Sequence, residues 1–561
     1  MSEYAISSWY EAGLPVQERK RRGHFSTPPE LVERILDACG YTPEQPLSSI
    51  RVLDPACGSG NFLAAATHRL LLSGHLHDRS SADILTTVQQ RIWGFDPDPV
   101  ACFMAEMQLR THLAQDFDEA ALPALHIHQG DGLALPWHGY QGVDLFLANP
   151  PYLAAKNTDL SGYHSARQRG QTDSYLLFVS LALQVVRPDG WLALVLPDPV
   201  LARENATRER QRLLSETTIH HLWHLSGVFS AHVGAVVLIA QKRPPAHLHQ
   251  IPWIRGHWLT LEKKAGRPAK AAPNKPVRAR TVLAAYEEIP LKKTSQALLL
   301  NQSGSAFCYL LGEVQNSLIQ HLRDHLSSQS QETLMPLGEL VQIRRGEELS
   351  KETPLLLDRR PEAATQNWYP VLKGGGEVRP YVLPEGKYWL AHEHIDKPLE
   401  RYLLPKLIVV KSTGRLQATL DLRGHVVLQT LYLLRLPLPH SLTSQPGEQP
   451  EEEAGIDFLY FLLALLNSRL LREYVYVLHT AYKWVQPQIE QHVLANLPIP
   501  NVEFAARAAI IERAKQLYAC SSSTPIVELE QRWNALYEEQ ELAICALYTL
   551  ALSVACVPSS S

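Results

Sequence analysis

The sequence predicts an α/β protein, with a doubly wound, mostly parallel sheet followed by a mixed α+β domain and a helical tail. From about residue 23 to 240, short apolar runs alternate with amphipathic stretches, which is the strand–helix pattern that builds parallel sheets. Residues from about 300 to 500 are strand-like and irregular, and residues 504–553 contain two amphipathic helical stretches. The chain has 561 residues, which suggests about three domains of ordinary size.

Six runs in the first part are expected to be strands, because they are rich in Val, Ile, Leu and aromatic residues and are bounded by turn residues. They are Ile50–Leu53, Arg91–Phe95, Leu125–His128, Val143–Ala148, Trp191–Leu196 and Ala235–Ala240. Helical patterns lie between them, for example at Asn61–Leu72 and Ser174–Val186, and a further helix is expected near residues 458–478. The predicted domains are residues 1–242 and 301–561, joined by a linker over residues 243–300.

The formal net charge of -4 hides an uneven distribution of charge along the chain. Residues 1–240 carry 18 basic and 25 acidic side chains, residues 241–280 carry 10 and 1, and residues 281–561 carry 25 and 31. A segment this basic, between two acidic bodies, is expected either to contact a polyanion or to form a solvated linker.

Membrane and metal functions are not expected. No apolar run approaches the roughly 18–20 residues that a membrane helix needs. The seven cysteines stand singly, without a CxxC pair, which indicates reduced thiols in a cytoplasmic protein. The histidines His220, His221 and His224 have no cysteine or carboxylate cluster near them, so we expect no metal site there.

A tight glycine turn follows the first predicted strand, where residues 50–63 read IRVLDPACGSGNFL. Gly58 and Gly60 let the backbone approach a ligand, and the start of the following helix supplies N–H donors. Dinucleotide binding is the usual alternative for such a loop, but Asp54 would repel a pyrophosphate and favour a cationic amino group. We expect Ala56 and Cys57 to line the same site.

Two more acidic residues follow the next two predicted strands. Asp96 ends the second strand, and Asp131 follows the third. The carboxyl ends of parallel strands meet at one edge of a sheet, where Asp96 would reach ribose hydroxyls and Asp131 would accept from an adenine amino group. With Asp54, they fit a nucleoside that carries a positively charged amino acid. S-Adenosylmethionine is therefore the predicted cofactor; the alternative is three unrelated surface turns.

The predicted strand Val143–Ala148 runs directly into Asn149, Pro150, Pro151 and Tyr152. The amino lone pair of adenine is delocalised, so a catalyst must free it for attack on a methyl group. The side-chain oxygen of Asn149 and the carbonyl of Pro150 can accept both N–H bonds, and Tyr152 offers a flat face for a base taken out of the duplex. The chain has no Pro-Cys pair, the usual site of the nucleophile for cytosine C5 methylation.

In this order, the motifs resemble those of the TaqI-type gamma-class DNA adenine-N6 methyltransferases. The resemblance includes the GHFSTPP segment of residues 23–29 and implies a class I S-adenosylmethionine-dependent methyltransferase fold. It also implies that Thr27 contacts the cofactor and that Phe229, in a Val-Phe-Ser segment, stacks with Tyr152 on the flipped adenine. Family members often have an aromatic residue directly after the third acidic residue, where this chain has Gly132.

The second half resembles the specificity domain of the same enzymes, in residues 405–411, 429–432, 466–468 and 497–500. The implied partner is double-stranded DNA. Six basic side chains are expected to contact its phosphates, which dominate affinity for DNA. They are Lys263, Lys264, Arg267, Lys406, Lys411 and Arg415.

The resemblance implies a sequence-specific methyltransferase that acts on the N6 amine of a flipped adenine, in restriction–modification or phage defence. We expect a cytoplasmic monomer. One alternative is a modification or recognition subunit that works with a separate restriction endonuclease. Another is a protein glutamine methyltransferase, which would leave the second half of the chain without a purpose.

Overall fold

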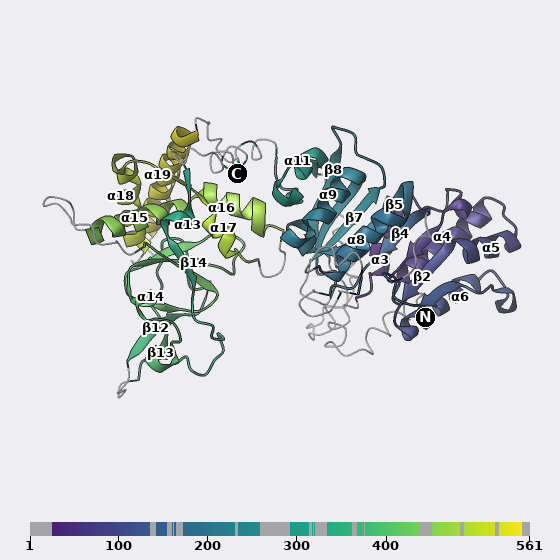
Figure 1. The fold of residues 1–561 in the computed structure, drawn as a ribbon, viewed down its shortest axis with the longest axis horizontal. Helices are drawn as coiled ribbons and strands as arrows, with labels where there is room; N and C mark the ends of the chain where they lie inside the picture. The colour runs from purple at the N-terminus through teal and green to yellow at the C-terminus, as the bar shows by residue number, and fades with distance from the viewer. Residues whose placement is uncertain are drawn as a thin grey trace. The chain divides into compact units, whose positions relative to one another are not determined.

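A computed structural model describes residues 25–134, 142–153, 160, 162–163, 172–229, 234–258, 292–312, 317, 319, 322, 334–361, 367–374, 376–437, 451–482, 487–521 and 527–552. The chain divides into two compact units, unit 1 (Met1–Leu310) and unit 2 (Leu311–Ser561). In Figure 1, unit 1 runs from purple to teal and unit 2 from teal-green to yellow.

Unit 1 contains one nine-stranded sheet with the order β3-β2-β1-β4-β5-β7-β6-β8-β9. Strands β1 to β5 run parallel, and β7 runs antiparallel to both β5 and β6. The strands are β1 (Val52–Asp54), β2 (Ile92–Asp96), β3 (His126–Gln129), β4 (Val143–Ala148), β5 (Val186–Pro197), β6 (Thr218–Ser226), β7 (Ala235–Gln241), β8 (Gln250–His257) and β9 (Lys292–Ser295).

Both faces of this sheet are covered, as in a doubly wound fold. Leu145 and Leu147 of β4 belong to a core with α3, α4 and α6, while Phe146, which points to the other face, is equally buried. Alternate side chains of a strand point to opposite faces; α8 and α9 lie on the second face. The helices are α3 (Pro29–Ala38), α4 (Asn61–Leu76), α5 (Ser81–Arg91), α6 (Pro99–Leu113), α8 (Ser174–Val185), α9 (Thr207–Glu216) and α11 (Gln296–Leu300).

All six predicted strands are present, and within residues 23–240, the part for which strands were predicted, one strand of this sheet was missed. β5 starts at Val186, five residues before the predicted Trp191. The missed strand, β6, has the sequence TIHHLWHLS. Its histidines interrupt the apolar pattern by which a buried strand is recognised. One of them, His224, is fully buried, and its Nδ1 lies 2.7 Å from the Tyr309 hydroxyl.

The predicted linker differs from the structure, because part of it belongs to the sheet of unit 1. β8 and β9 pair with each other and β8 pairs with β6, and both Trp253 and Trp258 are buried. The buried guanidinium of Arg210 also donates to the carbonyls of Gly304 and Ser305. Unit 1 therefore extends beyond the predicted boundary at residue 242.

Unit 2 contains three small sheets, with the orders β11-β17-β14-β15, β13-β12-β16 and β10-β18. Its strands are β10 (Leu334–Pro336), β11 (Gln342–Arg345), β12 (Trp368–Leu372), β13 (Tyr388–Ala391), β14 (Lys406–Val410), β15 (Ala418–Asp421), β16 (Val426–Val427), β17 (Leu431–Arg435) and β18 (Pro498–Pro500). Its helices are α13 (Leu337–Leu340), α14 (Glu400–Leu403), α15 (Glu451–Asn467), α16 (Arg469–Val475), α17 (Gln491–Ala495), α18 (Phe504–Ser521) and α19 (Val527–Leu552).

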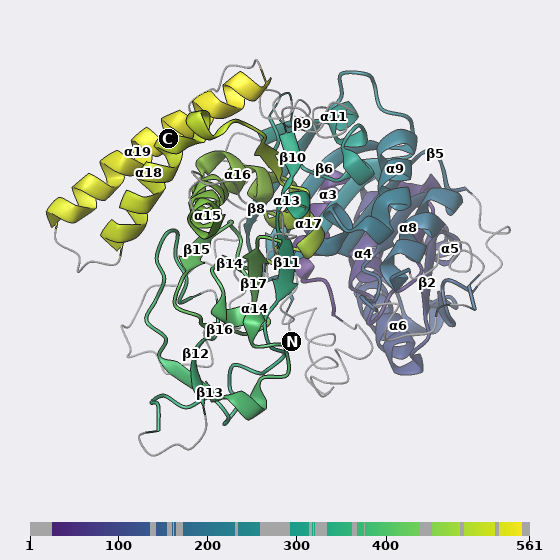
Figure 2. The ribbon, with the colours of Figure 1, turned by 60° about the vertical axis from the view of Figure 1, so that its left-hand side comes forward.

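The two tail helices were predicted correctly. α18 and α19 lie side by side (Figure 2), and the Gln540 amide donates to the Ile510 carbonyl across their interface. The helix expected near residues 458–478 is broken: α15 ends at Asn467, and the Ser468 hydroxyl accepts from Leu471 N–H at the start of α16. Among the described residues, no single helix is long and apolar enough to cross a bilayer; a bent pair, Glu453–Asn467 with Arg469–Thr480, passes that test only jointly.

Candidate functional site

A cavity of about 760 Å³ lies in unit 1 at the carboxyl ends of β1, β2, β3 and β4. We call it the strand-end cavity. Nine of the predicted site residues line it, namely Thr27, Asp54, Ala56, Cys57, Gly58, Asp96, Asp131, Asn149 and Pro151. The other predicted residues of unit 1 that the structure describes, Gly60, Pro150, Tyr152 and Phe229, are not in its lining.

Asp54, at the end of β1, is almost completely buried. One of its oxygens accepts from Ala56 N–H at 3.1 Å. Burial raises the pKa of this carboxyl to about 8; the Ala56 hydrogen bond opposes the shift, and the charge of Asp96 adds to it. A cation placed beside Asp54 would favour its ionised form, so the position suits a ligand amino group.

Asp96, at the end of β2, is held by two backbone donors. Its Oδ1 accepts from Asp98 N–H at 2.9 Å, and its Oδ2 accepts from Gly58 N–H at 3.0 Å. These bonds fix the carboxylate beside the glycine turn. Cys57 is buried next to it, and burial keeps the pKa of its thiol far above the ordinary value, so a packing role fits this cysteine.

Asp131, just after β3, also uses both oxygens. Its Oδ1 accepts from Leu133 N–H at 2.9 Å, and its Oδ2 accepts from the hydroxyl of Tyr163. Tyr163 was not predicted as a site residue, because it lies in an irregular segment without a recognisable motif. Its contact with Asp131 depends on tertiary structure alone.

Gly60 has a different role from the one expected. It caps α4 with a φ of 94°, a left-handed conformation that favours glycine. A Cβ at this position would lie 2.8 Å from the Cα of Ala105 in α6. Gly60 therefore allows α4 and α6 to pack closely, while Gly58, in the same turn, lines the cavity.

Thr27 brings an unsatisfied polar atom to the cavity. It is buried, and its Oγ1 finds no hydrogen-bond partner within the described residues. Its carbonyl accepts from the Asn61 amide at 2.9 Å, which fixes the segment before α3 against α4. Buried polar atoms are nearly always hydrogen-bonded in folded proteins, so the Thr27 hydroxyl fits a contact with a polar ligand.

Asn149 is oriented by its amide nitrogen, which donates to the backbone carbonyl of Phe25. A carbonyl accepts only from the NH₂ side of an amide, so the other side of the group, Oδ1, remains as an acceptor. Phe25 and Thr27 lie in the same segment. The sequence predicted that Thr27 contacts the cofactor, but it did not predict that this segment also orients Asn149.

Ser174, the first residue of α8, holds the turn after Asn149. Its hydroxyl donates to the Pro151 carbonyl and accepts from Leu153 N–H at 3.0 Å, and its own N–H donates to the Leu153 carbonyl at 3.0 Å. The sequence placed Ser174 correctly at a helix start, but it did not reveal that this helix start meets the turn.

The aromatic residues Tyr152 and Phe229 form a cluster with Phe25. The Phe229 ring lies 5.8 Å from Phe25 and 6.1 Å from Tyr152, between ring centroids, and is buried. The Tyr152 hydroxyl donates to the Val195 carbonyl at 3.3 Å. The cluster is joined to the cavity through Phe25, which lines it; base stacking by Phe229 stays a prediction.

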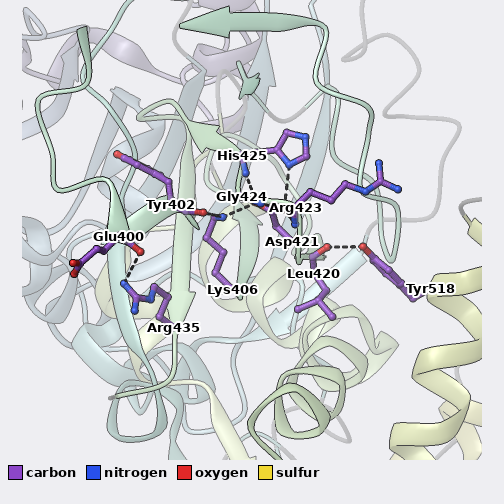
Figure 3. Close-up of polar contacts among 10 residues, drawn as sticks. All are labelled: Glu400, Tyr402, Lys406, Leu420, Asp421, Arg423, Gly424, His425, Arg435 and Tyr518. Atoms are coloured by element: carbon purple, nitrogen blue, oxygen red, sulfur yellow. Dashed lines mark hydrogen bonds and ion pairs between the residues drawn. The ribbon is translucent and has the colours of Figure 1, made fainter. Parts of the chain in front are cut away.

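In unit 2, the prediction that Lys406 contacts phosphate is wrong. Lys406 is fully buried and forms a 2.6 Å ion pair with Asp421, which lies opposite it on β15 (Figure 3). Asp421 also accepts from the backbone N–H groups of residues 423–425 and from His425 Nδ1. Burial alone would raise the pKa of Asp421, but the His425 bond and the Lys406 charge hold it well below the ordinary value.

The remaining basic residues predicted to contact DNA differ in their surroundings. Arg415 is exposed; it pairs with Glu473 at 2.9 Å and lies 4.4 Å from the centre of the Tyr476 ring. Lys411 is partly buried, and burial, with the charge of Arg345, lowers its pKa. Phosphate contact by both residues stays a prediction. Lys263, Lys264 and Arg267 lie outside the described residues.

The sheet order of unit 1, with one antiparallel strand inserted among parallel ones, and the acidic strand ends define a class I S-adenosylmethionine-dependent methyltransferase fold, which confirms the predicted fold class. Residues 4–266, just under half of the chain, match the family described as N-6 DNA Methylase. The finer resemblance to the TaqI type stays a prediction.

Sequence relatives are restriction–modification proteins. The chain is 25% identical over 224 residues to the type I restriction enzyme EcoEI methylase subunit of Escherichia coli, a match that covers 39% of this chain and 42% of that protein. It is 28% identical over 190 residues to the type II methyltransferase M.PaeR7I of Pseudomonas aeruginosa, with 32% of each chain covered. The chain thus matches less than half the length of these relatives.

A solved structure resembles nearly the whole chain in fold. The type IIL restriction–modification enzyme MmeI, solved in complex with DNA, is similar with a TM-score of 0.61 and 11% identity, over 98% of this chain and 79% of that chain. The DrdV–DNA complex is similar with a TM-score of 0.54 and 13% identity, over 93% and 60%. At these identities, the similarity concerns the fold alone.

The Lys406–Asp421 pair yields a stability prediction. Lys406→Met is expected to lower the free energy of unfolding of unit 2 by about 3–5 kcal/mol, since it leaves a buried carboxylate without its counter-charge. Thermal unfolding of the full chain, followed by calorimetry, measures the change. The control is Arg415→Ala, whose exposed ion pair contributes at most about 1 kcal/mol. Equal melting of the Lys406→Met variant and the wild type would contradict this assignment.

Proposed function

We propose that the chain is a DNA adenine-N6 methyltransferase that uses S-adenosylmethionine. The observation that carries the proposal is the position of Asn149: it lines the strand-end cavity, and its amide nitrogen is held by the Phe25 carbonyl. The acceptor Oδ1 is thereby kept for a substrate amine beside a cavity with three acidic strand ends. The restriction–modification relatives support the same substrate class.

The residues of the strand-end cavity fit the cofactor in their chemistry. Asp54 suits the amino group of its methionine part, Asp96 the ribose hydroxyls and Asp131 the adenine amine, because each carboxylate accepts hydrogen bonds. Thr27 supplies the buried hydroxyl that finds no partner within the described residues. When bound, S-adenosylmethionine supplies an activated methyl group.

The chain contributes orientation and hydrogen-bond acceptors to methyl transfer. Asn149 Oδ1 and the Pro150 carbonyl accept the two N–H bonds of the target amine, which frees its lone pair for in-line attack. Such positioning is worth several kcal/mol of the barrier. Ser174 fixes the turn that carries both acceptors, and Tyr152 and Phe229 are the proposed faces for the extruded base.

Unit 2 is the proposed reader of DNA sequence. The likeness in fold extends over both units to MmeI, which was solved with DNA, and this likeness supports duplex DNA as the partner. A separate nuclease that acts with this chain and a location in the cytoplasm remain predictions.

Asn149→Ala is expected to reduce methyl transfer at least a thousandfold, because the target amine loses an acceptor that acts in the transition state. Purified chain, methyl-labelled cofactor and DNA of mixed sequence are incubated, and N6-methyladenine is quantified by mass spectrometry. Affinity for S-adenosylhomocysteine, measured by calorimetry, should stay within about threefold. Asn496→Ala, in unit 2, is the control and should leave transfer and cofactor affinity unchanged.

Two results would contradict this proposal. One is a wild-type chain that binds the cofactor well but places no label in adenine of any DNA. The other is an equal loss of transfer and cofactor affinity in Asn149→Ala, which would assign Asn149 to cofactor binding rather than to the substrate.

Asp54 predicts a pH dependence of cofactor affinity. Its pKa is about 8 in the free protein, and a cationic amino group stabilises the ionised form, so binding below pH 8 must release a proton. Affinity for S-adenosylhomocysteine is therefore expected to rise with pH, by up to about tenfold per unit, and to level off near pH 8. Calorimetry in buffers of different ionisation enthalpy counts the protons; Asp54→Asn should release none at this step and bind more weakly.

Ser174→Ala tests positioning of the turn. The change removes the hydroxyl that contacts Pro151 and Leu153, so the acceptors should lose their fixed geometry, and kcat should fall about ten- to hundredfold. Affinity for S-adenosylhomocysteine should change little. Ser174→Thr keeps the hydroxyl and is expected to restore much of the lost kcat; failure of Thr to exceed Ala would argue against the hydroxyl contact.

A further inference from the structure

Tyr163 closes the Asp131 end of the strand-end cavity. It lies in a short turn in which its N–H donates to the Leu160 carbonyl at 3.1 Å, and both residues line the cavity. Its hydroxyl donates to Oδ2 of Asp131. Burial, together with Asp131, raises the pKa of this phenol, so the hydroxyl keeps its proton and acts as a donor at neutral pH.

The chain position directly after Asp131 offers no aromatic face. A Cβ on Gly132 would lie 2.0 Å from the carbonyl oxygen of Pro55, a distance that no side chain can accept. The backbone itself therefore forms the wall of the cavity at Gly132. An aromatic ring against a nucleobase held at Asp131 must come from another segment, and Tyr163 already contacts that carboxylate.

We infer that the ring of Tyr163 is the face against which the adenine of the cofactor packs, and that its hydroxyl holds the ring there through Asp131. The inference rests on the proposed function and names a further binding residue for that cofactor. A carboxylate oxygen has two lone pairs, so Oδ2 of Asp131 can accept from the Tyr163 hydroxyl and from the adenine amine together.

The geometry separates two contributions of Tyr163. The ring supplies a flat apolar surface, which binds a base largely independently of its hydrogen-bonding pattern. The hydroxyl supplies only the anchor on Asp131. Tyr163→Ala removes both contributions, while Tyr163→Phe keeps the ring and removes the anchor, so the two variants are expected to differ in their affinity for the cofactor.

The test measures the affinity of the full chain for S-adenosylhomocysteine by calorimetry. This probe carries the same base and amino acid as the cofactor but no transferable methyl group. Tyr163→Ala is expected to bind about tenfold more weakly, within the range of base–aromatic stacking lost on substitution by Ala. Tyr163→Phe is expected to bind about threefold more weakly. The control, Tyr369→Ala, replaces a partly buried tyrosine of unit 2 and should bind like the wild type.

A second measurement locates the base without relying on affinity. The 8-azido analogue of S-adenosylhomocysteine is photolysed on the wild-type chain, and tryptic peptides are mapped by mass spectrometry. Trypsin cuts after Lys156 and Arg167, so the label is expected on the peptide of residues 157–167. It should be absent from that peptide in Tyr163→Ala.

The outcomes distinguish this inference from the proposed function. A wild-type chain that does not bind S-adenosylhomocysteine would overturn both. The inference alone would be overturned if the wild-type chain binds the probe and methylates adenine, and Tyr163→Ala has the same affinity for the probe as the wild type. Tighter binding by Tyr163→Phe than by the wild type would also overturn it, because the hydroxyl would then compete with the base for Asp131. So would a label confined to other peptides.

Discussion

Parallel pairing around β1 is the constraint on which the site depends. Val52 of β1 pairs with Ile92 of β2 on one side and with Leu145 of β4 on the other. This register brings the ends of β1, β2 and β3, and with them the carboxyls at or just after these ends, to one edge of the sheet. Grouped carboxylates repel one another, so each needs compensation from its surroundings.

The three carboxyls receive different numbers of hydrogen bonds from the protein, and this difference indicates which kind of ligand group each of them suits. Asp96 accepts from two backbone N–H groups, and Asp131 accepts from one N–H and from the Tyr163 hydroxyl. Asp54 is the most buried of the three, and the structure gives it one backbone hydrogen bond. A cationic ligand group at Asp54 would supply what the protein does not, whereas neutral donors suffice at the other two. The arrangement therefore favours a ligand with its positive charge at one end.

How much the sequence predicts depends on whether an interaction is local. Strand composition and the alternation of strands with helices place the acidic residues correctly, because the ends of parallel strands must meet. Contacts of Ser174 and Tyr163 join segments that are separated in the chain by 23 and 32 residues, and neither contact has a local pattern. The turn at Gly60 is an intermediate case. The glycine is evident from the sequence, but the reason that glycine is needed there, the close approach of Ala105, is a tertiary contact.

Lys406 shows that the surroundings of a charged residue, too, cannot be predicted from local sequence alone. A lysine before an apolar strand is usually exposed, and its burial here follows from pairing with Asp421, fifteen residues later. A buried charge that is neutralised by a partner adds no counterion release on DNA binding, so Lys406 cannot contribute to the salt dependence that phosphate contacts produce. Arg415 starts from an ion pair with Glu473, and a phosphate would have to replace that partner. A count of basic residues therefore overstates the electrostatic contribution that unit 2 would make to the proposed DNA binding.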